Sequence, residues 1–203
     1  MGTEATFQAI PEDCELLARA RADTEVAELM AFFNSYAIGR HPFGWQPKTS
    51  AQTYFNSAVK ALIQQRPGLV QRYLYAGRKY DMIVYLLSEE RRKGNRDTDT
   101  SLIHKAIWGS ERLHPVARAT QGLPIGLVPA QDVVRITEFI STITYDHFHQ
   151  HYKPPEMEKM GVYKIYAGDG EEVFSEIWDE FQDIRRFYNE ATANNEAAVT
   201  VID

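Results

Sequence analysis

Hydrophobic and polar positions alternate at the start of the chain, and a strongly apolar run closes it. Across residues 3–10, small or apolar residues alternate with polar ones, which is the period-two pattern of a half-buried strand. Residues 197–202 are rich in β-branched side chains and predict a second strand. A strand at each end with helices between them indicates an α/β fold whose small sheet includes both terminal strands.

Between these two strands, most hydrophobic residues recur at the three- and four-residue spacing of amphipathic helices. The short apolar run 125–128 instead predicts a strand. The segment 69–74 predicts a short helix closed by Gly77, and Asp169 is expected to cap the last and longest helix. The helices predicted from this spacing cover residues 14–18, 26–33, 54–63, 69–74, 80–94, 102–108, 129–143 and 169–191.

The composition changes this picture little, because it is that of an ordinary globular domain. The 203 residues are 44% hydrophobic and 25% charged, so we expect a single domain over residues 1–203. The lone cysteine, Cys14, cannot form an intramolecular disulfide, which favours a reducing compartment and therefore the cytoplasm. No apolar run approaches the roughly 18 residues that cross a bilayer, so no membrane contact is expected.

The chain has a formal net charge of −6, and its charged residues are unevenly distributed along the sequence. Residues 1–30 carry seven acids against two bases, and residues 66–96 carry eight bases against three acids. A basic stretch in a chain with a pI near 5.6 fits a cationic helix end better than a nucleic-acid site, so no nucleic-acid partner is expected. The acidic start would suit a basic protein partner.

Histidines at positions 147, 149 and 151 are the most conspicuous candidate metal ligands. On a strand all three would share a face, but the aromatic neighbours favour a helical turn, where only His147 and His151 do. Two ligands would need others from elsewhere in the chain. Neither a serine nucleophile elbow nor a phosphate-binding glycine loop occurs, and the sequence predicts no cofactor and no catalytic residue.

Several segments taken in order resemble the YfbM-like family of bacterial proteins, a domain of unknown function. The resemblance rests on residues 100–109, on residues 127–133 with Pro129 at a helix start, on Gly161 to Tyr163, and on the closing helix and strand. It covers residues 1–10 and 78–203, and it implies a helix-rich three-layer α/β sandwich. Residues 24–77 match weakly and are interpreted as an extra helical segment.

Two hypotheses about function follow. The first, which the sequence favours, is a cytoplasmic interaction or adaptor module, for example with an immunity-like role, whose acidic face meets a basic protein partner. The second is a ligand-binding protein or enzyme with a pocket near Tyr80, Asp81, His104 and Tyr163, because the family-like segments gather polar and aromatic residues there. Tyr80 and Val84 stand where the family pattern has tryptophan and histidine, which argues against shared catalysis. A structure in which the four pocket residues are scattered would exclude the second hypothesis.

Overall fold

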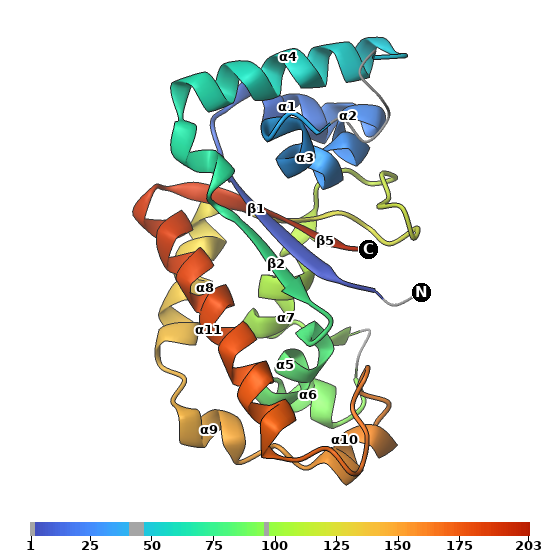
Figure 1. Ribbon diagram of the computed structural model, residues 1–203, viewed down its shortest axis with the longest axis vertical. Helices are drawn as coiled ribbons and strands as arrows, with labels where there is room; N and C mark the ends of the chain where they lie inside the picture. The colour runs from blue at the N-terminus through green and yellow to red at the C-terminus, as the bar shows by residue number, and fades with distance from the viewer. Residues whose placement is uncertain (1–2, 41–46, 96–97) are drawn as a thin grey trace.

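A five-stranded antiparallel sheet runs through the middle of the protein. The computed structural model describes residues 3–40, 47–95 and 98–203. The strands lie in the order β2-β1-β5-β4-β3, so the two terminal strands are neighbours near the centre of the sheet (Figure 1). Their bounds are β1 Ala5–Pro11, β2 Tyr73–Gly77, β3 Glu111–Arg112, β4 Gly126–Val128 and β5 Glu196–Ile202.

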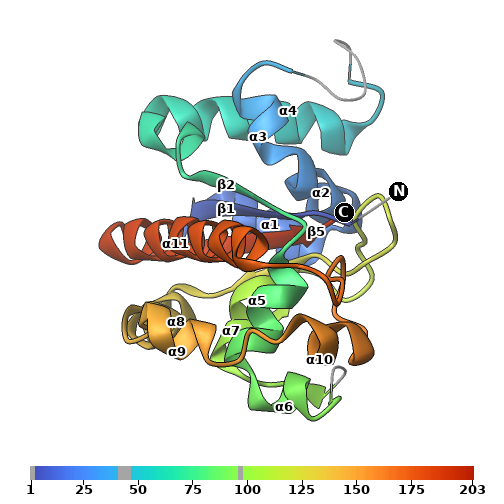
Figure 2. The same cartoon turned by 60° about the horizontal axis from the view of Figure 1, so that its bottom comes forward.

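Helices cover both faces of this sheet. The first face carries α1 Glu15–Ala22, α2 Thr24–Leu29, α3 Phe33–Ala37 and α4 Ser50–Gln65, together with the 3-10 turns η1 Met30–Phe32 and η2 Pro67–Val70. The remaining helices are α5 Tyr80–Leu87, α6 Glu89–Arg92, α7 Leu102–Trp108, α8 Ala130–Ser141, α9 Tyr145–His149, α10 Pro154–Lys159 and α11 Glu171–Ala193. In Figure 2 the sheet lies between α3 and α4 on one side and α5, α7 and α8 on the other. None of the helices described is both long and apolar enough to cross a membrane.

The two faces of the sheet bury separate hydrophobic cores. Along β5, Ala198 and Ile202 pack against α8 and α11, whereas Val199 and Val201 pack beneath the α1–α4 layer. Every residue of β5 is buried, as expected for a central strand covered on both sides. This arrangement confirms the predicted helix-rich three-layer sandwich with both terminal strands in the sheet.

The predicted helix over 69–74 is wrong. The chain makes only a 3-10 turn to Val70 and then forms β2, which pairs with β1 through Leu74 opposite Phe7 and Tyr75 opposite Thr6. The helical spacing there is too short to compete with pairing to an existing strand edge, and the aromatic residues suit a strand. Gly77 ends β2 with a φ of +58°.

The start of α11 also differs from the prediction. Gly170, not Asp169, is the N-cap, and it offers no side-chain oxygen to the helix. The Asp169 carboxylate instead accepts a hydrogen bond from the Tyr166 backbone amide at 2.8 Å, which closes the turn before the helix. The Asp169 side chain therefore stabilises the preceding turn and does not cap the helix.

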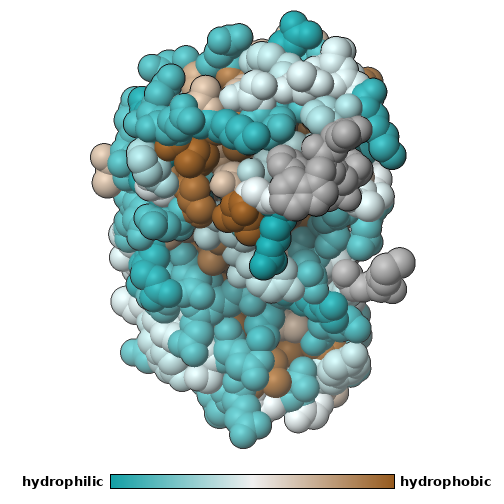
Figure 3. Space-filling model, turned by 45° about the horizontal axis from the view of Figure 1, so that its top comes forward, coloured by the Kyte–Doolittle hydropathy of each residue, from teal (hydrophilic) through white to brown (hydrophobic). Residues whose placement is uncertain are grey.

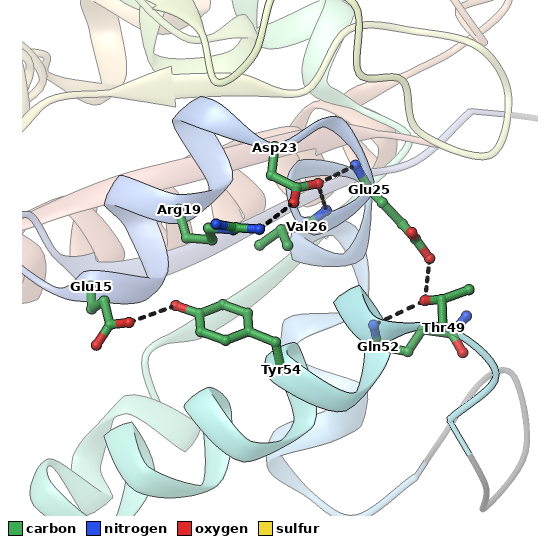
Figure 4. Close-up of polar contacts among 8 residues, drawn as sticks. All are labelled: Glu15, Arg19, Asp23, Glu25, Val26, Thr49, Gln52 and Tyr54. Atoms are coloured by element: carbon green, nitrogen blue, oxygen red, sulfur yellow. Dashed lines mark hydrogen bonds and ion pairs between the residues drawn. The ribbon is translucent and has the colours of Figure 1, made fainter.

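Polar contacts join α1, α2 and α4 across the first layer (Figure 4). Asp23 caps α2 and also pairs with Arg19, at 2.9 Å. The Glu25 carboxylate accepts a hydrogen bond from the Thr49 hydroxyl, and the Tyr54 hydroxyl donates to Glu15. On the face shown in Figure 3, most of the surface is hydrophilic, and hydrophobic side chains are visible in separate areas of its upper and lower parts.

Candidate functional site

A buried ion pair links α5 to α6. Asp81 and Arg91 each expose only 3% of their surface, and two hydrogen bonds join them: Nε to Oδ1 at 3.1 Å and Nη2 to Oδ2 at 3.0 Å. Ser88 separates the two short helices and caps the second, which turns Arg91 back toward Asp81. The sequence alone does not distinguish Arg91 from the other bases of residues 66–96, which are expected at a cationic helix end.

The same pair fixes the loop that precedes α11. The Tyr163 amide donates to Asp81 Oδ2 at 2.8 Å, and Arg91 donates to the carbonyl oxygens of Met160 at 3.3 Å and Gly161 at 3.4 Å. A charge pair with this many hydrogen bonds has a well-defined geometry in a medium of low dielectric constant. Asp81 and Arg91 therefore hold α5, α6 and the 160–163 segment in one arrangement.

Aromatic rings surround this pair. Tyr80 stacks on Tyr163 with ring centroids 6.1 Å apart, and it meets the edge of Trp108 at 5.9 Å. His104 lies nearly parallel to Trp108, at 6.1 Å and an interplanar angle of 20°. Thr3 bonds to both tyrosine hydroxyls, donating its amide to Tyr163 and sharing a hydrogen bond with Tyr80. The N-terminal segment thus closes one side of the cluster.

A cavity of about 450 Å³ opens beside these groups, between α5, α7 and the β3–β4 pair. We call it the α5–α7 cavity. Of the four residues predicted for a pocket, Asp81 and His104 line it, while Tyr80 and Tyr163 lie directly behind Asp81 and Trp108. Its lining comprises Asp81, Val84, Arg91, His104, Trp108, Gly109, Ser110, Glu111, Arg112 and Pro124.

Gly109 sets the shape of one cavity wall. It ends α7 at a φ of +89°, and an ideal Cβ at this position would lie 2.6 Å from the Leu127 backbone nitrogen. Only glycine tolerates both the dihedral angle and the close approach. The chain therefore turns sharply from α7 into β3, close against β4, which places Trp108 and Ser110 on the cavity. The Ser110 Oγ is buried and has no hydrogen-bond partner among the residues described.

A second carboxylate supports His104 at the start of α7. Asp99 is 4% exposed and accepts a hydrogen bond from the Ser101 amide at 2.8 Å, and the Ser101 hydroxyl caps α7 by accepting the His104 amide. Burial raises the pKa of Asp99, but hydrogen bonds from Ser88 and Ser101 and the nearby His104 outweigh it, so the pKa lies below its usual value. A carboxylate thus stays ionised close to the imidazole.

The predicted histidine pair does not line the α5–α7 cavity. His147 belongs to α9 and His151 follows that helix, with ring centroids 6.5 Å apart. His149 turns away and contacts Glu171 at 3.1 Å. Within the described ranges, no three histidine, cysteine or acidic side chains are grouped so as to hold a metal ion. Metal binding through His147 and His151 stays a prediction that would need further ligands.

The aromatic residues 43 and 45, which the sequence places in a loop, lie outside the residues described.

Comparison with known proteins places this architecture in a family. The family model of the domain of unknown function 1877 matches residues 1–201. The chain belongs to this family. A search of curated proteins finds no match. The crystal structure of YfbM from Escherichia coli, a protein of unknown function, is similar with a TM-score of 0.60 at 13% identity, over 98% of this chain and 99% of that one.

Membership in the family of domain 1877 confirms the resemblance seen in the sequence. At 13% identity, the likeness to YfbM shows the fold alone. The matched range includes residues 24–77, whose described part contains α2, η1, α3, α4, η2 and β2. That this segment is an addition to the family pattern remains our proposal.

Proposed function

We propose that this protein binds a small polar molecule with a flat ring in the α5–α7 cavity. One observation carries the proposal: side chains from α5, α6, α7 and the turn after α7 converge on a single cavity of about 450 Å³. A cavity of this size with a few convergent polar groups is typical of small-molecule sites. The Asp81–Arg91 pair supplies a fixed dipole, His104 supplies a polar imidazole, and Trp108 supplies an aromatic wall.

The chemistry of the lining indicates the kind of ligand. The His104 and Trp108 rings are nearly parallel and both residues line the cavity, so a planar ring of a ligand can stack against one of them. Asp81 and Arg91 already neutralise each other, so they act as a rigid dipolar wall and do not attract a strongly charged ligand.

The acidic-face hypothesis is supported less well. Arg21 pairs with Glu12 at 3.5 Å, Glu28 accepts the Arg118 amide, and Glu12 also accepts the Ala130 amide. With the contacts of Glu15, Asp23 and Glu25 described above, most acids of residues 1–30 have intramolecular partners. These acidic side chains bond within the protein, whereas an adaptor would leave them available to bind its partner. We therefore favour ligand binding, in the reducing compartment that the single cysteine indicates.

A library of planar polar metabolites, screened by thermal shift, tests the proposal. Compounds that raise the melting temperature of the protein should lose the effect in His104→Gln, which removes the imidazole from the cavity wall. His147→Gln is the matched control, because His147 is exposed on α9 and does not line this cavity. If hits stabilise the two variants and the wild-type protein equally, ligand binding in the α5–α7 cavity is excluded.

A further inference from the structure

A second cavity, of about 570 Å³, lies on the opposite side of α5. It is bounded by the end of β2, the first turn of α5, the middle of α11 and residues 164–169. Met82 faces it from α5, whereas Asp81 and Val84 face the α5–α7 cavity. The two cavities have no lining residue in common, so this one is an independent feature.

Glu180 is the half-buried carboxylate of this cavity. It extends from α11, and its Oε1 accepts a hydrogen bond from the Lys79 backbone amide at 3.2 Å. In the described part of the chain it forms no ion pair, whereas Glu4 pairs with Arg78 at 2.9 Å and Glu176 with Lys79 at 2.5 Å. Glu4 and Glu176 therefore already have cationic partners, whereas Glu180 bonds to a backbone amide.

Two tyrosine rings stand at the same cavity with much of their surface uncovered. Tyr75 is 55% exposed and Tyr166 is 57% exposed, and both line the cavity. Cations are attracted to the faces of such rings, and partial burial strengthens this attraction. A half-buried carboxylate beside exposed aromatic faces is the combination that proteins use for organic cations.

Gly77 brings the carboxylate and one ring together. An ideal Cβ on Gly77 would lie 3.3 Å from Glu180 Oε2 and 3.9 Å from Tyr75 Cε1. The missing side chain thus leaves a space that both groups border. Because Gly77 also has a φ of +58°, the turn after β2 favours the one residue that keeps this space open.

We propose that this cavity is a binding site for an organic cation, an alkylammonium or guanidinium group, held by the Glu180 carboxylate and covered by the Tyr75 and Tyr166 rings. The site does not depend on the function proposed for the α5–α7 cavity. Arg78 and Lys79 do not oppose the cation strongly, since each is paired with a glutamate. The Lys164 ammonium lies 5.8 Å from the centroid of the Tyr163 ring, where it is partly satisfied.

Protonation of Glu180 makes the binding pH-dependent. Burial raises the pKa of Glu180 to about 7, opposed by Lys79 and reinforced by Asp183 and Glu176. The cation needs the ionised carboxylate, so affinity should increase as the pH rises from 6 to 8, about one unit on either side of that pKa. The charged groups around Glu180 are Glu4, Arg78, Lys79, Lys164, Asp169, Glu176 and Asp183.

Calorimetric titration of the whole protein with choline, and with an otherwise neutral peptide carrying one arginine, tests the site. We expect at least one probe to bind at pH 8 and to bind about tenfold more weakly at pH 6. Preference for choline would indicate a free small molecule as the natural ligand, and preference for the peptide would indicate a basic side chain of a partner. Failure of both probes to bind at millimolar concentration overturns the proposal.

Variants distinguish this site from general electrostatic attraction. Glu180→Gln keeps a hydrogen-bond acceptor for the Lys79 amide and should weaken binding about tenfold at pH 8, because a charge-assisted contact is lost. Tyr166→Leu should weaken it about threefold through the lost ring face. Glu138→Gln, on the exposed side of α8, is the matched control and should bind like the wild-type protein. Equal affinity for Glu180→Gln and Glu138→Gln would also refute the site.

Discussion

Replacing Arg91 with methionine removes the guanidinium that neutralises Asp81 inside the protein. Methionine keeps most of the apolar stem of the arginine side chain. The Asp81 carboxylate, which is 3% exposed, keeps its hydrogen bond from the Tyr163 amide but loses the guanidinium. Two charge-assisted hydrogen bonds, at 3.0 and 3.1 Å, are lost together with two bonds to backbone carbonyls. Breaking one partner of a buried pair costs about 3–5 kcal/mol of unfolding free energy.

Urea denaturation followed by tryptophan fluorescence measures this cost. Arg135→Met is a matched control, because its pair with Asp132 is exposed on the arginine side, at 63%, and should contribute about 1 kcal/mol or less. The variant Asp81→Asn tests the other partner, and the double variant with Arg91→Met should be less destabilised than the sum of the two single changes. Loss of no more than about 1 kcal/mol in Arg91→Met, or strict additivity, would refute the structural role given to the pair.

Three further predictions follow from single residues. Gly109→Ala should lose at least about 2 kcal/mol of unfolding free energy, because an added Cβ would collide with β4. Gly122→Ala should lose less, since Gly122 also has a positive φ but an added Cβ there would meet open space. Equal losses in urea denaturation would show that the contact with β4 is unimportant. The free energy of unfolding of the wild-type protein should fall relative to that of Glu180→Gln as the pH rises from about 4.5, the ordinary pKa of a glutamate, to about 7, the raised pKa of Glu180 in the folded protein. Between these pH values the unfolded chain ionises the carboxyl group while the folded protein keeps it protonated, so the contribution that is present at low pH is lost; parallel pH profiles would contradict this. Cys14 should react with iodoacetamide more slowly than a free cysteine at pH 8, because burial raises the pKa of its thiol; mass spectrometry showing equal rates would argue against that burial.

The sequence predicts the helices well where an amphipathic pattern is long. The spacing from Phe174 to Ala191 identifies α11, and the alternation over residues 3–10 identifies β1. It fails for β2, where a strand is selected by pairing with β1 and not by its own five residues. Long-range pairing of this kind leaves no periodic signal in a short segment.

The candidate site is predicted in the same uneven way. His104 and Asp81 were found because family-like segments place them among aromatic residues, and both line the α5–α7 cavity. Arg91 is not predicted, because an arginine exposed at a helix end and an arginine buried against an aspartate ten residues earlier have the same appearance in the sequence. Glu180 was missed too, because the exposed and the half-buried glutamates of α11 differ only in what packs over them.

The indole signal of Trp108 in a ¹H–¹⁵N NMR titration tests the central claim most directly. The chain has three tryptophans, so three indole signals are expected, and Trp108→Phe identifies the one at the cavity. A planar metabolite found by thermal shift should move this signal in a saturable way and leave the Trp178 signal in place, because Trp178 packs against Phe148 away from the cavity. If every stabilising compound leaves the Trp108 signal unmoved, the α5–α7 cavity is not the binding site of this protein.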